Sequence, residues 1–312
     1  MQGAPMRTIH LTWLSTAALL LAACGGSSDA DVDAGPGGPD ADADTTLRVV
    51  SPDIEIAPGE EITYCYYFDM PNDAEVGVRR WTSTMTPGSH HLIVFLAGSG
   101  APAAGTLVPD CDGFGLGDEW MYSAQTPENE AVMPDGVGMP IGAGRRAFVQ
   151  MHYLTASDVT LDAHVEVTAE VYPAGTAYTR AAAYITYSQG FSIPANSMGQ
   201  AGDTCAVPAD AKFFAMSTHS HHYSMQTDVF DGATNILTST SWEHPTVETW
   251  DDDPYFSFAS GELTYACEYF NDTASTVYEG SSAQLNEMCM AVGYFFPAPN
   301  GPRLCVNGFV LP

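Results

Sequence analysis

The chain has 312 residues, of which 45% are apolar, so we expect two folded domains rather than one hydrophobic core. With 38 acidic and 9 basic residues the formal net charge is −29. This charge excludes a protein that binds the phosphate backbone of nucleic acids, because such binding needs a basic surface. The 29 glycines and 21 prolines, with abundant Val, Thr and Ser, favour short strands joined by turns, and therefore an all-β chain.

Residues 1–23 have the features of a lipoprotein signal peptide. Arg7 supplies positive charge, residues 11–21 are mostly apolar, and small residues precede Cys24. This segment resembles a bacterial lipobox, whose cysteine is lipidated and becomes the first mature residue. A membrane-spanning helix is disfavoured because the apolar run is too short. We therefore expect a protein of the bacterial cell envelope, periplasmic or surface-exposed, that is anchored to the membrane through Cys24 only.

Residues 24–46 predict an acidic disordered tether, because they are rich in Asp, Ala, Gly and Pro and show no apolar periodicity. Six cysteines follow the tether, and an even number in an exported chain predicts three disulfides. Six cysteines can pair in many ways, so their spacing leaves the connectivity open. They are Cys65, Cys111, Cys205, Cys267, Cys289 and Cys305.

The first predicted domain, residues 47–175, contains two adjacent histidines at the start of an apolar strand. His90 and His91 follow the turn Pro87-Gly88 and precede residues 92–95. Adjacent residues of a regular strand face opposite ways, so both histidines reach one metal only at a strand end or bulge. The turn makes such an irregularity expected.

A second apolar strand is predicted for residues 147–154, with His152 on the same face as Phe148 and Gln150. A lone histidine on such a strand is usually a hydrogen-bonded core residue. Residues 161–171 alternate strictly and place His164 on the solvated face, so we do not expect it to be a ligand.

The second predicted domain, residues 176–312, begins after Pro173-Ala174-Gly175 and carries the sequence His219-Ser220-His221-His222 at the end of an apolar strand. Because strand side chains alternate, His219 and His221 project the same way and His222 projects the other way. Two imidazoles on one face are half of a metal site, although such pairs also occur without a metal.

Five histidines thus lie in three strand-associated clusters, two in the first domain and one in the second. This distribution suggests two metal sites. Imidazole ligands suit copper or zinc, and an added thioether would favour copper, because soft sulfur stabilises Cu(I). The chain has 13 methionines, most of them expected to be packing residues, so the residues alone do not select a sulfur ligand.

Four motifs, in this order, resemble those of the type II, ascorbate-dependent copper monooxygenases, which include peptidylglycine α-hydroxylating monooxygenase and dopamine β-monooxygenase. The resemblance extends from about Leu47 to the C-terminus and implies two jelly-roll-like β-sandwich domains facing each other across a cleft, in a protein that we expect to be a monomer. The motifs are His90-His91, Gln150-x-His152-Tyr153, His219-x-His221-His222 and Glu287-Met288-Cys289.

The resemblance also implies residue roles. An electron-transfer copper would be held by His90, His91 and His152, with Gln150 beside it as a cofactor-binding residue on the electron path. An oxygen-activating copper would be held by the catalytic residues His219, His221 and Met288. The implied disulfides are Cys65–Cys111, Cys205–Cys305 and Cys267–Cys289.

The implied reaction is hydroxylation of a C–H bond of a small molecule by O₂, with two copper ions and ascorbate or a similar one-electron reductant. Ser217 stands where peptide-amidating members carry the arginine that grips the substrate carboxylate, and Met290 and Val292 replace their Asn and Tyr. A glycine-extended peptide is therefore not the expected substrate. The alternatives are a non-catalytic extracytoplasmic copper-binding protein and, less favoured because no general base is placed, a mononuclear zinc hydrolase.

Overall fold

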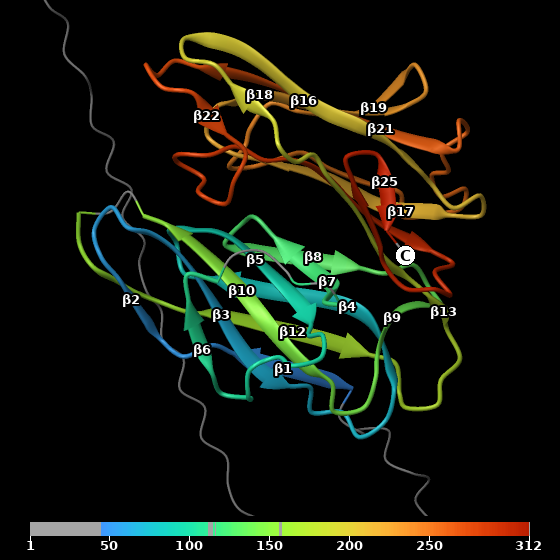
Figure 1. Ribbon diagram of the computed structural model, residues 1–312. Helices are drawn as coiled ribbons and strands as arrows, with labels where there is room; N and C mark the ends of the chain where they lie inside the picture. Colours follow the sequence, from blue (N-terminus) through green and yellow to red (C-terminus); the bar gives the residue numbers. More distant parts are fainter. Residues whose placement is uncertain (1–44, 112–114, 116, 156–157, 312) are drawn as a thin grey trace, which may run out of the picture. The chain divides into compact units, whose positions relative to one another are not determined.

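The computed structural model of the protein describes residues 45–111, 115, 117–155 and 158–311 (Figure 1). The predicted signal peptide, Cys24 and the predicted tether up to residue 44 lie outside this part. Residues 42–312 form one compact unit. Its described residues form strands, turns and loops, so the prediction of an all-β fold is confirmed. Within the same residues no helix has the length and apolar character needed to span a bilayer.

Two sheets, both formed before residue 181, make up the first half of this unit. The outer sheet has the order β1-β12-β4-β9-β13, with β8 beside β4, and the inner sheet has the order β6-β3-β10-β5-β7. A short pair, β11 and β2, extends them. The bounds are β1 (Thr46–Val50), β2 (Ile54–Ile56), β3 (Glu61–Asp69), β4 (Val76–Met85), β5 (Ser89–Leu96), β6 (Leu107–Pro109), β7 (Glu119–Ala124), β8 (Glu128–Val132), β9 (Val137–Ile141), β10 (Arg146–Leu154), β11 (Leu161–Ala163), β12 (Val165–Val171) and β13 (Thr179–Arg180).

Two further sheets make up the second half. The inner sheet has the order β20-β17-β23-β14-β24-β25, the outer sheet has the order β16-β21-β18-β19, and β15 pairs with β22. The predicted boundary near residue 175 separates these sheets from the first two except for β13, and the division into two domains stays a prediction. The bounds are β14 (Ala182–Tyr187), β15 (Ser192–Ile193), β16 (Ser197–Ala206), β17 (Lys212–Ser220), β18 (Ser224–Asp231), β19 (Thr234–Ser239), β20 (Val247–Thr249), β21 (Glu262–Asn271), β22 (Val277–Tyr278), β23 (Cys289–Phe296), β24 (Arg303–Val306) and β25 (Phe309–Leu311).

The central strands of both inner sheets are buried on both faces. In β5, Leu92 and Val94 enter the core between the two sheets of the first half, whereas Ile93 and Phe95 belong to a separate cluster. This explains why β5 is continuously apolar rather than alternating, since a half-exposed strand would carry polar residues at every second position.

The separate cluster is formed where the two inner sheets pack against each other, and we call it the central core. From β23, Met290 and Val292 belong to the central core, while Ala291 and Phe295 enter the core of the second half. Phe148 of β10 also joins the central core. Residues of β5, β10 and β23 therefore meet in the middle of the unit.

The three disulfides implied by the resemblance are confirmed: Cys65–Cys111, Cys205–Cys305 and Cys267–Cys289. Each bond joins residues within one half. Disulfides persist in oxidising compartments, so their presence agrees with an extracytoplasmic protein.

Leu92→Ala should lower the free energy of unfolding by about 2–5 kcal/mol, because Leu92 is fully buried and truncation leaves a cavity behind the strand that carries His91. Urea unfolding with the disulfides intact measures the change. The matched control is Leu285→Ala, whose side chain is 71% exposed and should change stability by less than about 0.5 kcal/mol. Equal effects of the two variants would contradict the assigned core.

Candidate metal centre

A bulge at the start of β5 brings His90 and His91 together. Gly88 has a φ of +101°, which favours glycine, and closes the turn before the strand. His91 lies opposite His152 of β10, but the next pair joins Tyr153 to Ser89, so His90 is the extra residue of the bulge. The rings of His90 and His91 have centroids 5.0 Å apart. The irregularity expected from the sequence is therefore present.

His152 is the cross-strand neighbour of His91, and their ring centroids lie 5.0 Å apart. Its Nε2 lies 3.0 Å from Oε1 of Glu61, a β3 residue. Because this contact occupies Nε2, Nδ1 is the nitrogen left for another partner. A carboxylate in this position orients an imidazole and raises its basicity as a ligand.

His219 and His221 lie at the end of β17 and face each other, with 3.3 Å between their Nε2 atoms. The register of β17 and β23 pairs His219 with Met290 and Ser220 with Cys289. Continuing this register by one residue places Met288 opposite His221. His222 follows the strand in a turn and is exposed, in line with its predicted opposite direction.

All five histidines form a single cluster. The His90 ring centroid is 5.5 Å from that of His219 and 6.0 Å from that of His221, and the His91 and His219 centroids are 5.1 Å apart. One nitrogen from each of His90, His91 and His219 lies within 4.8 Å of the others. The resemblance implies one triad in each of two domains that face each other across a cleft, whereas in the structure the two triads are in contact because the two inner sheets pack face to face.

The electrostatics of the cluster keep four of its imidazoles neutral. Burial, reinforced by the neighbouring imidazoles, lowers the pKa of His90, His91 and His221 well below the usual value, and it lowers the pKa of His219 to about 3. Neutral imidazole has a lone pair for a metal. The atoms His90 Nε2, His91 Nδ1 and His221 Nδ1 are buried and have no hydrogen-bond partner among the described residues. Unpaired buried polar atoms are costly, so this donor set fits a bound metal ion.

Gln125 and Trp242 also contact the cluster, although no sequence pattern marks them. Gln125 lies between β7 and β8, and its Nε2 donates to the Thr218 carbonyl at 3.1 Å. This orients its Oε1, 2.8 Å from His219 Nδ1, to accept a hydrogen bond from the N–H group of that nitrogen and leave His219 Nε2 for a metal. The ring of Trp242 packs against His90, with centroids 5.3 Å apart.

Glu61 connects the two halves beside the cluster. Besides contacting His152, its carboxylate accepts hydrogen bonds from Ser282 Oγ at 2.6 Å and from the backbone N–H of Ala283. Burial raises the pKa of Glu61, but the hydrogen bonds from His152, Ser282 and Ala283 outweigh that effect, so the pKa is lowered. Ser282 and Ala283 precede Met288 in the chain, so one carboxylate holds a histidine of one predicted triad and the loop leading to the other.

Glu287, fully buried, fixes the backbone around the second predicted triad. Its Oε2 accepts from the N–H of His221 at 3.0 Å and of Met288 at 3.2 Å, and its Oε1 accepts from the N–H of Tyr223 at 2.5 Å. Burial raises the pKa of Glu287 to about 7, although these backbone hydrogen bonds oppose the rise. The residue before Met288 therefore links the backbones of two predicted ligands.

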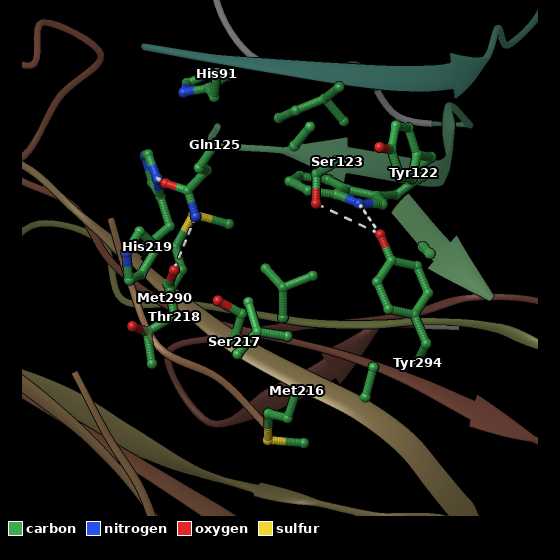
Figure 2. A pocket seen from close by; sticks show the side chains of 18 of the residues that line it. His91, Tyr122, Ser123, Gln125, Met216, Ser217, Thr218, His219, Met290 and Tyr294 are labelled. Carbon is green, nitrogen blue, oxygen red and sulfur yellow. Dashed lines mark hydrogen bonds between the residues drawn. The ribbon is translucent and has the colours of Figure 1, made fainter. Parts of the chain in front are cut away.

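A cavity of about 810 Å³ opens beside the cluster and is lined by His91, His152, His219, His221 and Met288 (Figure 2). Gln150, 5% exposed, also lines the cavity, and its Nε2 donates to the Cys111 carbonyl at 3.4 Å. The predicted site residues of both halves thus border one space.

Glu287→Gln should lower the free energy of unfolding by about 2–3 kcal/mol, because an amide group replaces a carboxylate oxygen facing buried N–H donors. Copper affinity should fall about 10- to 100-fold, as when other residues that orient ligands are changed. Urea unfolding and copper titration are the measurements. Glu262→Gln, an exposed glutamate, is the control and should change neither. A Glu287→Gln protein with unaltered copper affinity would show that Glu287 does not position the ligands.

Comparisons with known proteins do not assign a family. No protein-family model and no curated protein matches the chain. Among solved structures, PNGase F, a glycosylasparaginase from Flavobacterium meningosepticum, aligns over 81% of this chain and 95% of its own with 9% identity and a TM-score of 0.34. A broad bean stain virus structure aligns over 84% of this chain and 93% of its own with 10% identity and a TM-score of 0.23. Scores this low support no conclusion about relationship or function.

Proposed function

We propose that the protein is a copper-dependent monooxygenase that hydroxylates a C–H bond of a small molecule with O₂ and a one-electron reductant such as ascorbate. The observation that supports it best is the cluster of five histidines, three with buried ring nitrogens that have no hydrogen-bond partner among the described residues, beside Met288 and a cavity. Bound copper would supply one-electron redox chemistry and O₂ activation there.

The donor set favours copper over other metals. His90, His91 and His152 would hold one ion, and His219, His221 and the Met288 thioether would hold a second. Imidazoles with a soft thioether accept both Cu(I) and Cu(II). The neighbours of the ligands have positioning roles. Gln125 and Glu61 each engage one nitrogen of a histidine ring, and the ring of Trp242 packs against His90.

Zinc hydrolysis is less well supported, because the nearby carboxylates are already committed. A hydrolase needs a general base within reach of the metal-bound water. Glu61 bonds to His152, Ser282 and Ala283, and Glu287 accepts three backbone N–H groups. Neither carboxylate is among the described residues that line the cavity, so neither is placed to take a proton from water there. A non-catalytic copper-binding protein would use the same ligands, so turnover must distinguish it from an enzyme.

We propose that the protein is extracytoplasmic. Three disulfides agree with an oxidising, extracytoplasmic environment. We propose, from the lipobox resemblance, a lipid anchor at Cys24 in the bacterial cell envelope and a monomeric protein whose partners are O₂, the reductant and the substrate.

The reconstituted protein should bind two copper ions, and His152→Ala should reduce this to about one, because that change removes a ligand and the carboxylate contact that orients it. Elemental analysis after dialysis measures the stoichiometry. His164→Ala is the control, since the His164 side chain is 48% exposed and lies outside the cluster. Full copper content in His152→Ala would contradict the assigned ligands.

Met288→Ile should abolish ascorbate-dependent O₂ uptake, because isoleucine keeps the volume but removes the thioether. An oxygen electrode measures the rate, and mass spectrometry detects a hydroxylated product. Met225→Ile, at a 51% exposed position, should keep full activity. Copper binding without consumption of O₂ or reductant would instead favour the non-catalytic protein.

A further inference from the structure

The cavity beside the histidines has two chemically different ends. Figure 2 shows His91, His219 and Gln125 at one end and Tyr122 and Tyr294 at the other. Its volume of about 810 Å³ lies within the range of about 300–1,000 Å³ that is usual for small-molecule sites. A ligand that fills the space would therefore touch the metal centre and the distant end together.

The walls between these ends are mostly apolar, and the Ser217 hydroxyl among them already donates to the Thr246 carbonyl at 3.0 Å. Met290 and Val292, at alternate positions of β23, are buried in the central core and line the cavity. Met216 of β17 also lines the cavity and belongs to the core of the second half. An apolar group therefore gains more binding free energy from entering this cavity than a polar one does.

The charges at the cavity disfavour ionised ligands. Among the described residues, no Lys or Arg lines it, so a carboxylate or phosphate would find no basic side chain. The carboxylates that line it have partners or face solvent. Glu130 forms an ion pair with Arg80 at 2.7 Å, Glu279 accepts a hydrogen bond from Tyr187, and Asp251 is exposed. An ammonium group that enters the cavity would therefore lose its hydration, and to pair with Glu130 or Glu279 it would have to displace the present partner of that carboxylate.

The far end offers a small polar anchor. Trp120 Nε1 donates to the Tyr294 hydroxyl at 3.2 Å, and Ser123 Oγ lies 3.4 Å from the same oxygen. The latter separation is at the long limit of a hydrogen bond between hydroxyls. Burial raises the pKa of Tyr294, so its hydroxyl keeps its proton at neutral pH. A ligand oxygen at this end can accept from Tyr294 and exchange a hydrogen bond with Ser123.

We propose that the cavity takes a neutral, largely apolar molecule with one hydroxyl or carbonyl group, which Tyr294 and Ser123 hold at the end away from the histidines. This inference rests on the proposed function and specifies its substrate class. The anchored molecule presents a C–H bond to His219 and its neighbours. In the reaction that C–H bond is replaced by C–O–H, the second oxygen atom of O₂ leaves as water, and two electrons from the one-electron reductant and two protons complete the balance.

Fluorescence anisotropy with pyrene probes tests the inference on the full chain without added copper. The probes share one apolar body and differ in the group attached to it: 1-pyrenemethanol, 1-methylpyrene, 1-pyrenemethylamine and 1-pyrenecarboxylate. The alcohol should bind most tightly, and the carboxylate at least about tenfold more weakly. Tyr294→Phe should weaken binding of the alcohol about three- to tenfold, the equivalent of one hydrogen bond, and leave the affinity for 1-methylpyrene unchanged.

Two further variants separate recognition from structural damage. Ser123→Ala should weaken binding of the alcohol, and it keeps the Tyr294 hydroxyl that accepts the hydrogen bond from the Trp120 N–H group. Tyr278→Phe, at a 62% exposed position, should leave the binding of every probe unchanged. The inference is overturned if the charged probes bind as tightly as the alcohol, if no probe binds, or if Tyr294→Phe weakens 1-methylpyrene equally. Binding without copper is independent of turnover, so failure of the Met288 experiment would remove the proposed reaction and leave the ligand class standing.

Discussion

Face-to-face packing of the two inner sheets is the constraint on which the rest of this structure depends. Ile93 and Phe95 on one sheet, and Met290 and Val292 on the other, are buried in the central core. The same strand faces carry the histidines, so burial of apolar surface at one place fixes the positions of the imidazoles at another. The arrangement of the histidine cluster is therefore set by the packing of two sheets rather than by one loop.

Much of the local structure could be predicted because it follows from short-range geometry. Alternation along a strand correctly relates His152 to Gln150, and His219 to His221. The turn before His90 correctly indicates an irregular strand start. The disulfide connectivity is predicted by the family resemblance alone, because the spacing of cysteines contains no information about which strands become neighbours.

The spatial relation between the two triads could not be predicted. Sequence periodicity gives the face of a strand, but not the distance between sheets that belong to different halves. Gln125 contacts His219 across 94 positions, and Glu61 reaches Ala283 across 222. Such contacts depend on tertiary packing, and a single glutamine or glutamate carries no pattern that distinguishes it from a surface residue. Fully buried Glu287 shows this most clearly, since composition alone would place it in solvent.

The composite origin of the cluster has a thermodynamic consequence. His90 and His91 belong to the first half and His219 to the second, yet their nitrogens lie within 4.8 Å of one another. These nitrogens stay together only while the two inner sheets are packed, so the geometry of the cluster depends on the stability of the contact between the halves. A change that loosens this contact, even far from the histidines, would therefore alter the arrangement of the candidate ligands.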